Sequence, residues 1–434
     1  MKSDKQGLKE KQKRRKLNIN WSNILAYFGT ILLALLVTVG AIWAFGFNNI
    51  GSNLVASLAG FLVGAFATRI LELGRRRLAD MRKVTTTDLH YDKKTYKKKV
   101  YLGEKETTIW YDPITNDVNT RYEVKDHPEN KFVLDNFLTA HYSQIMLAHQ
   151  TSYIDNPMMI RLDDCVQHED GHYELITSRT AYYNDLVTNR SMDYKFSGDL
   201  TVRKVYEGGK YLTPLSESHM SNHIGIIAHV FYGNKTILAQ RGGNATISKN
   251  KFTTCIAAGL SQDDILQAHK VNFRKTDTQM NEDDLLRVVL LYKLADRLNL
   301  DYDKQVLPLY QKGLIKVYLL GLGQLCYTGG KPQFYYAITI DESVDLSNIN
   351  NRKINKQQID YNKCMLVVSD LSLKKEHVLS LKCIQRNKNG EVKNKLAHIN
   401  GEAERSFYIG LWHMQNQAKI DGIPDWVYAK PQQH

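Results

Sequence analysis

A group of polar and aromatic residues between positions 177 and 241 has side chains that suit a phosphate-bearing ligand. Arginine and histidine can donate charge-assisted hydrogen bonds to phosphate oxygens, and tyrosine rings can stack on nucleotide bases. The sequence therefore predicts a ligand-binding site in this region. Its residues are Arg179, Tyr182, Tyr183, Arg190, Arg203, His223 and Arg241. For any one of them a place in the core or in an ion pair is an alternative, so only the group carries the prediction.

A second set of candidate residues follows the helical period of residues 284–300. Carboxylates on one face of such a helix can hold divalent metal ions, which neutralise a diphosphate and activate water. Here Lys293 and Arg297 put cations on that face beside Asp296. Cations at these positions can hold a phosphate through charge-assisted hydrogen bonds. The alternative is a solvated helix face on which Asp296 is a neighbouring counter-charge.

The sequence predicts no metal site. His219 and His223 lie four residues apart, which would suit one face of a helix, but residues 216–222 have the composition of a loop. The five cysteines include no Cys-x-x-Cys pair. We therefore expect buried thiols rather than disulfides or zinc ligands.

The elements that must position these residues follow from the apolar pattern beyond residue 100. Helices are predicted at 136–149, 282–299 and 401–420. Strands are predicted at 172–177, 224–231, 236–240, 314–320, 334–340, 365–368 and 377–383. Gly233 and Asn234 form the expected turn of a hairpin. Because no internal repeat or low-complexity linker follows residue 100, the pattern indicates an α+β fold of one compound domain with insertions.

Positive charge is concentrated in the first hundred residues. They hold 19 Lys and Arg against 6 Asp and Glu, which accounts for the whole net charge of +13. The remaining residues are neutral as a set. This argues against a protein whose main body coats a nucleic-acid polymer, and it favours a basic segment that faces anionic lipid.

Residues 17–68 contain no Asp, Glu, Lys, Arg or His. One helix of that length would far exceed the roughly 30 Å hydrocarbon core of a bilayer, and the polar turn at residues 47–53 predicts two spans at 24–46 and 54–71. Basic residues flank this hairpin, so both termini are expected in the cytoplasm. A cleaved signal peptide is the alternative, but the apolar run is too long for one. Gly60 and Gly64 are expected to pack the spans together within one subunit or between subunits.

The order of these elements resembles a Nudix domain over residues 165–425. In that family a hairpin ending in Gln-Arg, here residues 240–241, leads to a glycine-rich strand, here residues 255–260. A helix with an Arg-Glu-x-x-Glu-Glu core follows. In this chain the four core positions are occupied by Tyr292, Lys293, Asp296 and Arg297. The resemblance implies a Nudix-like α/β/α sandwich whose metal-binding helix has lost most of its carboxylates. It therefore implies that Lys293 and Arg297 bind a phosphate without hydrolysing it and that no residue is catalytic.

The whole arrangement is similar to the membrane-spanning Nudix effectors of cyclic-oligonucleotide-based antiphage signalling systems (CBASS). This resemblance implies a basic cytoplasmic tail (1–23), a two-helix transmembrane hairpin (24–71), a basic juxtamembrane and connecting region (72–164) and a degenerate Nudix-like sensor domain (165–425). It implies a multi-pass protein of the cell inner membrane that binds a cyclic di- or trinucleotide made by a companion nucleotidyltransferase. Ligand binding would drive homo-oligomerisation, and the hairpins would then disrupt the lipid bilayer and cause cell death or growth arrest.

Two other functions stay open from the sequence. A membrane-anchored Nudix hydrolase of nucleoside diphosphate derivatives would hold magnesium with Asp284, Asp296 and Glu282, whereas the sensor needs no cofactor. Magnesium-dependent turnover of nucleotides would identify the hydrolase. A polybasic scaffold that only concentrates partners would respond to no nucleotide at all.

Overall fold

The computed structural model divides the chain into two compact units, Met1–Met81 and Arg82–His434. In the first unit only Gly60 and Gly64 are described, and both are helical and exposed. In the second unit the described residues are 99–102, 105–147, 149, 155–196, 200–209, 211–240, 252–273, 282–346, 364–373, 379–386, 392–399 and 402–428.

The predicted fold class, with an N-terminal transmembrane hairpin, is wrong for the part of the chain that the structure describes. No helix there is long and apolar enough to cross a membrane. Its longest helix, α8 (Glu282–Leu298), has 17 residues and carries charged side chains, whereas a span needs about 20 predominantly apolar residues. Apart from Gly60 and Gly64, the predicted tail and hairpin at residues 1–71 lie outside the described residues.

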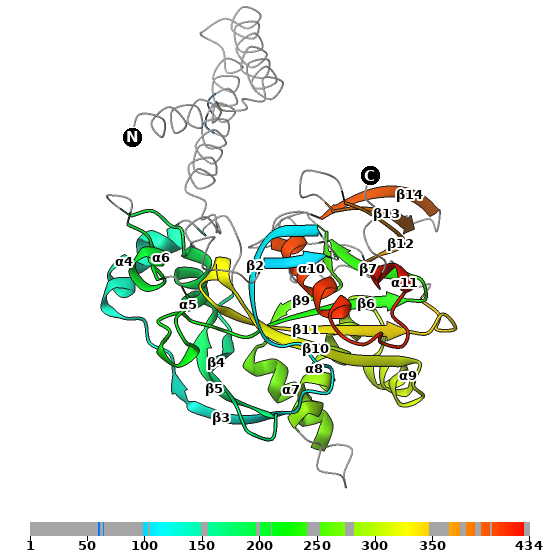
Figure 1. Cartoon of the computed structure of the whole chain (residues 1–434), viewed down its shortest axis with the longest axis horizontal. Coiled ribbons are helices and arrows are strands. Elements are labelled where there is room, and N and C mark those ends of the chain that lie inside the picture. The colour runs from blue at the N-terminus through cyan, green and yellow to red at the C-terminus, as the bar shows by residue number, and fades with distance from the viewer. Residues whose placement is uncertain are drawn as a thin grey trace, which may run out of the picture. The chain divides into compact units, whose positions relative to one another are not determined.

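A large mixed sheet dominates the second unit (Figure 1). Its strands run in the order β1-β2-β10-β11-β6-β7-β12-β13-β14, with β8 paired to β7 and β9 paired to β6. β6 and β11 are parallel, and the other pairs are antiparallel. The strands are β1 (Lys99–Leu102), β2 (Lys105–Thr115), β6 (Gly225–Tyr232), β7 (Lys235–Gln240), β8 (Phe252–Thr254), β9 (Ile256–Gly259), β10 (Ile315–Leu325), β11 (Lys331–Ile340), β12 (Cys364–Leu373), β13 (Leu379–Arg386) and β14 (Val392–Ile399).

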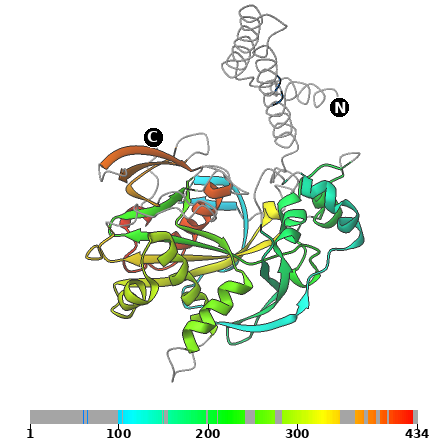
Figure 2. The same cartoon turned by 180° about the vertical axis from the view of Figure 1, so that it is seen from behind.

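Alternate side chains of β6 belong to two apolar layers. Ile226, Ala228 and Val230 share a cluster with the buried residues of α8. Ile227 and Phe231 share another cluster with α10 (Glu402–Gln415). Successive side chains of a strand point to opposite faces, so these two helices cover opposite faces of the sheet. Figure 1 shows α10 in front of the sheet. Figure 2 shows the sheet from behind, with α7 (Gln262–Phe273) and α8 on the near side.

Local features of the chain explain where α7 begins and where α8 ends. Ser261 Oγ accepts from the Asp264 backbone N–H at 3.1 Å, and the Asp264 carboxylate accepts from the Ser261 N–H at 3.0 Å, which is a capping box. After α8, Asn299 takes a φ of 56°. This left-handed residue ends the helix, as asparagine and glycine commonly do.

A second sheet of three strands runs in the order β3-β5-β4. Its strands are β3 (Tyr122–Lys131), β4 (Met158–Gln167) and β5 (Tyr173–Ala181). β4 is also tied to the large sheet, because the Ile224 N–H donates to Ile160 O and the Ile160 N–H donates to Leu260 O, both at 2.9 Å. The remaining helices are α4 (Asn136–Leu147), α5 (Tyr182–Val187), η1 (Asn189–Ser191), α6 (Val202–Tyr206), η3 (Leu215–Glu217), the π-helix η4 (Tyr302–Val306), α9 (Leu307–Gln311), η5 (Cys326–Thr328) and α11 (Asp425–Tyr428).

The helices predicted from periodicity are confirmed as α4, α8 and α10, and the predicted strands correspond to β5, β6, β7, β10, β11, β12 and β13. The hairpin turn is confirmed as well, because Gly233 has a φ of 53° and Tyr232 pairs with Lys235 across it. The sequence did not predict the strands β1, β2, β3, β4, β8 and β14 or the helices α5, α6, α7, α9 and α11. The boundary predicted between residues 164 and 165 falls inside β4.

Candidate functional site

The first part of the site is the short helical segment that follows β5. Ala181 has an extended backbone and precedes α5, and η1 follows after Thr188. The Thr188 hydroxyl donates to Asn184 O at 2.5 Å, which satisfies a carbonyl at the end of α5. The chain therefore turns sharply here, and both Asp185 and Asn189 are completely buried.

The loop before β6 packs against this segment through side-chain amides. Asn189 Nδ2 donates to Asn222 Oδ1 at 3.0 Å, and the Asn222 N–H donates to Asn189 Oδ1 at 2.9 Å. Asn222 has a φ of 45°, in a left-handed region that asparagine tolerates better than most residues. The Ser221 N–H also donates to Thr188 Oγ1 at 3.1 Å. These bonds fix the backbone immediately before His223.

Lys331 comes from a third element, the hairpin between β10 and β11. Gly329 and Gly330 have φ angles of 63° and 81°, which glycine adopts without steric cost, and they bring Lys331 to the first position of β11. Thr328 O accepts from Asn189 Nδ2 at 2.8 Å, which ties this hairpin to η1. Lys331 is consequently only 3% exposed.

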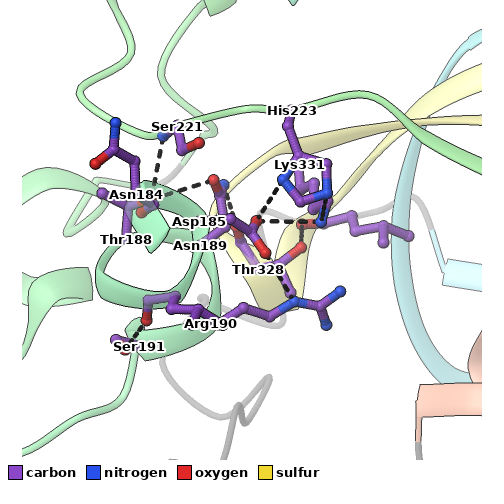
Figure 3. Close-up of polar contacts among 12 residues, drawn as sticks. Asn184, Asp185, Thr188, Asn189, Arg190, Ser191, Ser221, His223, Thr328 and Lys331 are labelled. Carbon is purple, nitrogen blue, oxygen red and sulfur yellow. Dashed lines mark hydrogen bonds and ion pairs between the residues drawn. The ribbon is translucent and has the colours of Figure 1, made fainter. Parts of the chain in front are cut away.

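These three segments meet at the carboxylate of Asp185 (Figure 3). Lys331 Nζ lies 3.1 Å from Asp185 Oδ1, and His223 Nδ1 lies 3.4 Å from the same oxygen. Arg190 Nε donates to Asp185 Oδ2 at 3.2 Å. Figure 3 shows the far end of the Arg190 guanidinium pointing away from α5. We refer to Asp185, Arg190, His223 and Lys331 as the charged cluster.

Burial sets the protonation of the charged cluster. Burial lowers the pKa of His223 to about 3, and the charges of Lys331 and Arg190 act in the same direction, against Asp185. The imidazole is therefore neutral at pH 7. Burial alone would raise the pKa of Asp185, but the charges of Lys331 and Arg190 and the hydrogen bond from Lys331 outweigh it and hold that pKa well below its usual range. The carboxylate is therefore ionised.

The contacts also fix the tautomer of His223. Lys331 Nζ lies 2.8 Å from His223 Nε2, and an ammonium group can only donate. Nε2 must therefore accept, so the imidazole proton lies on Nδ1. Nδ1 is 3.4 Å from Asp185 Oδ1, but it makes no hydrogen bond to that carboxylate or to another described residue. Lys331, His223 and Asp185 thus form a closed triangle of polar contacts inside the protein.

Aromatic and amide groups adjoin the charged cluster. The Tyr182 ring lies 5.8 Å from the His223 ring, tilted by 45°. Tyr182 and Tyr183 open α5 and are half-buried. Asn222 Nδ2 is buried and has no hydrogen-bond partner among the described residues. The structure therefore brings Tyr182, Arg190 and His223, all predicted site residues, into one place.

Two predicted site residues lie in separate ion pairs. Arg179 is buried and donates to both carboxylate oxygens of Asp126, at 2.6 and 2.7 Å. Arg203 is 1% exposed and makes two bonds to Asp193, at 2.9 and 3.0 Å. Arg203 also donates to the carbonyl of Tyr327 at 2.7 Å. This is the structural ion-pair alternative that the sequence left open for single arginines.

The cations predicted on α8 are paired with carboxylates. Lys293 Nζ lies 2.7 Å from Asp264 Oδ1 of α7, and Arg297 Nη1 lies 3.1 Å from Asp296 Oδ2. Arg241 lies outside the described residues. Gly60 and Gly64 are exposed, and a Cβ on either would meet nothing within 4 Å.

No group of three or more His, Cys, Asp or Glu side chains is placed to hold a metal ion in the described ranges. The absence of a metal or cofactor stays a prediction. Cys165, Cys255 and Cys326 form no disulfide, as predicted. Cys255 and Cys326 are buried, as predicted, whereas Cys165 is half-buried.

The sequence reading missed Asp185, Lys331 and the Asn189–Asn222 pair. Asp185 lies inside the predicted region, two residues after Tyr183, so an acid beside two candidate tyrosines was the available signal. For Lys331 the signal was its place after two glycines at the start of an apolar strand.

By its fold, the second unit is a mixed α/β protein built on an eleven-stranded sheet, with a charged cluster buried at one end of β11. In comparisons with known proteins, no protein-family model matches the chain, and no curated protein matches it either. The argument for function therefore depends on the geometry of the charged cluster.

Proposed function

We propose that this protein is a non-hydrolysing receptor for a phosphate-bearing nucleotide and that the ligand binds at the charged cluster. The class of ligand that we favour is a cyclic di- or trinucleotide, which is what the resemblance to CBASS effectors implies. The observation that carries the proposal is the convergence of Arg190, His223 and Lys331, from three separate segments, on one buried point beside Tyr182.

Such a point has the chemistry that a nucleotide requires. Arginine and lysine donate strong hydrogen bonds to phosphate oxygens, and stacking on an aromatic ring contributes about 1 to 3 kcal/mol per base. Tyr182 is half-buried and adjoins the cluster, so a base could stack there while its phosphate meets the cations. Asn222 Nδ2, which has no hydrogen-bond partner in the part of the chain that the structure describes, offers one more donor for a ligand oxygen.

Two contacts on α8 favour a receptor over a hydrolase. A Nudix-type hydrolase would need carboxylates on this helix that are available to divalent ions. Instead Asp296 neutralises Arg297, and Lys293 occupies the same helix with its own partner, Asp264. A divalent ion would therefore have to compete with Arg297 for the Asp296 carboxylate.

The test is thermal unfolding of the full chain with a panel of cyclic di- and trinucleotides, each with and without magnesium. A ligand at a hundred times its Kd should stabilise the protein by about 2.7 kcal/mol. We expect one ligand to raise the unfolding temperature without magnesium and to be recovered intact. Magnesium-dependent cleavage would favour the hydrolase, and no response to any ligand would favour the scaffold.

Two matched variants locate the binding site. Lys331→Gln removes a buried cation of the charged cluster and should weaken the ligand at least tenfold, which corresponds to about 1.4 kcal/mol. Lys316→Gln removes an exposed lysine that pairs with Asp421, and it should leave the affinity unchanged. Equal affinities of the two variants would place the ligand elsewhere.

The remaining expectations stay predictions. Homo-oligomerisation on ligand binding, a functional link to a companion nucleotidyltransferase, and a location at the cell inner membrane with both termini in the cytoplasm concern features that the described residues do not contain. Light scattering with and without the active nucleotide tests the first of these directly. Disruption of a membrane by a helical hairpin is not part of the proposal.

A further inference from the structure

We propose that the Asp185 carboxylate occupies the anion position of the charged cluster, and that a ligand phosphate must displace this carboxylate in order to bind. This inference rests on the proposed function, because it assigns an internal competitor to the same site. It makes Asp185 a regulatory residue that keeps the site closed in the absence of ligand.

The contacts of Asp185 are those that an anion would receive. One carboxylate oxygen accepts from Lys331 Nζ at 3.1 Å and lies 3.4 Å from His223 Nδ1, which makes no hydrogen bond among the described residues. The other oxygen accepts from Arg190 Nε at 3.2 Å. A phosphate group also presents several oxygens to converging donors, and cationic donors are its commonest partners in proteins. The carboxylate and a ligand phosphate therefore compete for the same donors.

The position of Asp185 in the chain couples this competition to the link between α5 and β11. Asp185 belongs to α5, whereas Lys331 begins β11 in the large sheet, so their ion pair links the helical segment to that sheet. The neighbouring link, from Asn189 to Thr328, does not involve a charge. Displacement of Asp185 would therefore remove a charged link between α5 and β11, while the link from η1 to the hairpin stays. A limited movement of α5 is the expected report of ligand binding.

The experiment uses the full chain with Asp185→Asn, which keeps the shape of the side chain and removes its charge. The probe is inorganic phosphate, and sodium chloride at equal ionic strength is the reference. We expect phosphate to raise the unfolding temperature of Asp185→Asn, and titration calorimetry to give a phosphate affinity at least tenfold higher than that of the unmodified chain. Equal affinities would overturn the inference.

Asp193→Asn is the matched control. It removes the carboxylate of another buried ion pair, but Arg203 keeps its bonds to the carbonyls of Cys326 and Tyr327. This variant should respond to phosphate no more than to chloride. A phosphate response of the same size in both variants would show a general effect of unpaired cations and would also overturn the inference.

The test remains decisive if Asp185→Asn does not fold in chloride. Cooperative unfolding should then return when phosphate is added, and its absence in both salts would contradict an anion site. The outcomes also separate the inference from the function it rests on. If Asp185→Asn binds phosphate but the unmodified protein binds no cyclic nucleotide, only the proposed function is refuted. A nucleotide response without that uptake would refute only the role of Asp185.

Discussion

Asn189 and Asn222 hydrogen-bond to each other in both directions. Asn189 Nδ2 donates to Asn222 Oδ1 at 3.0 Å, and the Asn222 backbone N–H donates to Asn189 Oδ1 at 2.9 Å. Asn189 also donates to Thr328 O at 2.8 Å. One buried amide thus holds three segments together: η1, the loop before β6, and the hairpin before β11. The charged cluster is assembled at the point where these segments meet.

Asn189→Asp should disrupt this junction. The variant replaces a buried amide that donates twice by a carboxylate, which then faces Asn222 Oδ1 and Thr328 O, both acceptors. Unsatisfied and repelling buried groups of this kind cost about 3 kcal/mol or more. Urea unfolding at pH 7 measures the loss. A loss below about 1 kcal/mol would show that the junction does not depend on this amide.

Arg203→Met should weaken folding but leave ligand binding intact. The guanidinium joins Asp193 to the carbonyls of Cys326 and Tyr327, and removing one partner of a buried ion pair costs about 3 to 5 kcal/mol. Because Arg203 lies outside the charged cluster, the affinity of the folded protein for nucleotide should not change. Binding titrations at a temperature where the variant is folded check this. A tenfold loss of affinity would restore Arg203 as a ligand-binding residue.

The regular elements could be predicted because their signals are local. α8 has an apolar stripe over many residues, and β6 and β7 are joined by a Gly-Asn turn. α7 was missed because its segment is mostly polar, although the Ser-x-x-Asp pattern of its capping box stands in the sequence at residues 261–264. The apolar pattern therefore predicts helices that bury many apolar residues and overlooks one that is mostly polar.

The site could be predicted only in part because its contacts are distant in sequence. Lys331 and Asp185 are 146 residues apart, and nothing near either residue indicates the other. Arg179, Arg190 and Arg203 look alike in the sequence. They differ only in the carboxylate that the fold brings to each, which no spacing reveals.

Glu207→Gln should stabilise the protein at alkaline pH. Glu207 is 3% exposed, and burial raises its pKa from 4.5 to about 7, more than the hydrogen bonds from Thr213 and the charge of Arg203 lower it. The folded chain therefore holds this proton more strongly than the unfolded chain. The resulting stability is fully present below pH 4.5 and is lost as the pH rises through 7.

Glutamine stays neutral and can still accept from the Thr213 N–H, which lies 3.1 Å from Glu207 Oε2. At pH 8 the variant should exceed the unmodified protein by about 2 kcal/mol, with only a small difference at pH 5. Urea unfolding at both pH values gives the comparison. A difference that does not change with pH would mean that Glu207 is already ionised in the fold at pH 5.

His413→Gln should make the protein less sensitive to acid. Burial lowers the pKa of His413 to about 3, with the nearby His229 acting in the same direction. The unfolded chain takes up this proton below its ordinary pKa of 6.5, whereas the folded chain resists it. Stability from this group is therefore complete above pH 6.5 and falls as the pH is lowered towards 3, by about 1.4 kcal/mol per pH unit.

Glutamine can replace both contacts of His413, which are the Tyr111 hydroxyl at 2.8 Å and Asn116 Oδ1 at 2.6 Å. The slope of the free energy of unfolding between pH 6 and pH 4 should therefore decrease by the equivalent of about one proton. The part of the pH dependence of the free energy of unfolding that comes from His229 should remain. Identical slopes for the variant and the unmodified protein would place the proton uptake on other groups.

Gly410→Ala should destabilise the protein although alanine is the better helix former. In an exposed helix this change would stabilise by about 1 kcal/mol. On α10, however, an added Cβ would lie 2.0 Å from His229 Nε2, in the layer between the helix and the sheet. Overpacking a buried interface costs about 1 to 3 kcal/mol, so the expected net change is a loss.

The double variant with His229→Ala isolates this contact. Removing the imidazole makes room for the new methyl group, so Gly410→Ala should cost less in the His229→Ala background than in the unmodified protein. Residues in direct contact show coupling energies of about 0.5 to 3 kcal/mol in such cycles, whereas independent sites add. Urea unfolding of the four proteins measures the coupling. Additive effects would show that α10 shifts to accept the methyl group, and the close packing of α10 on β6 would then not require glycine.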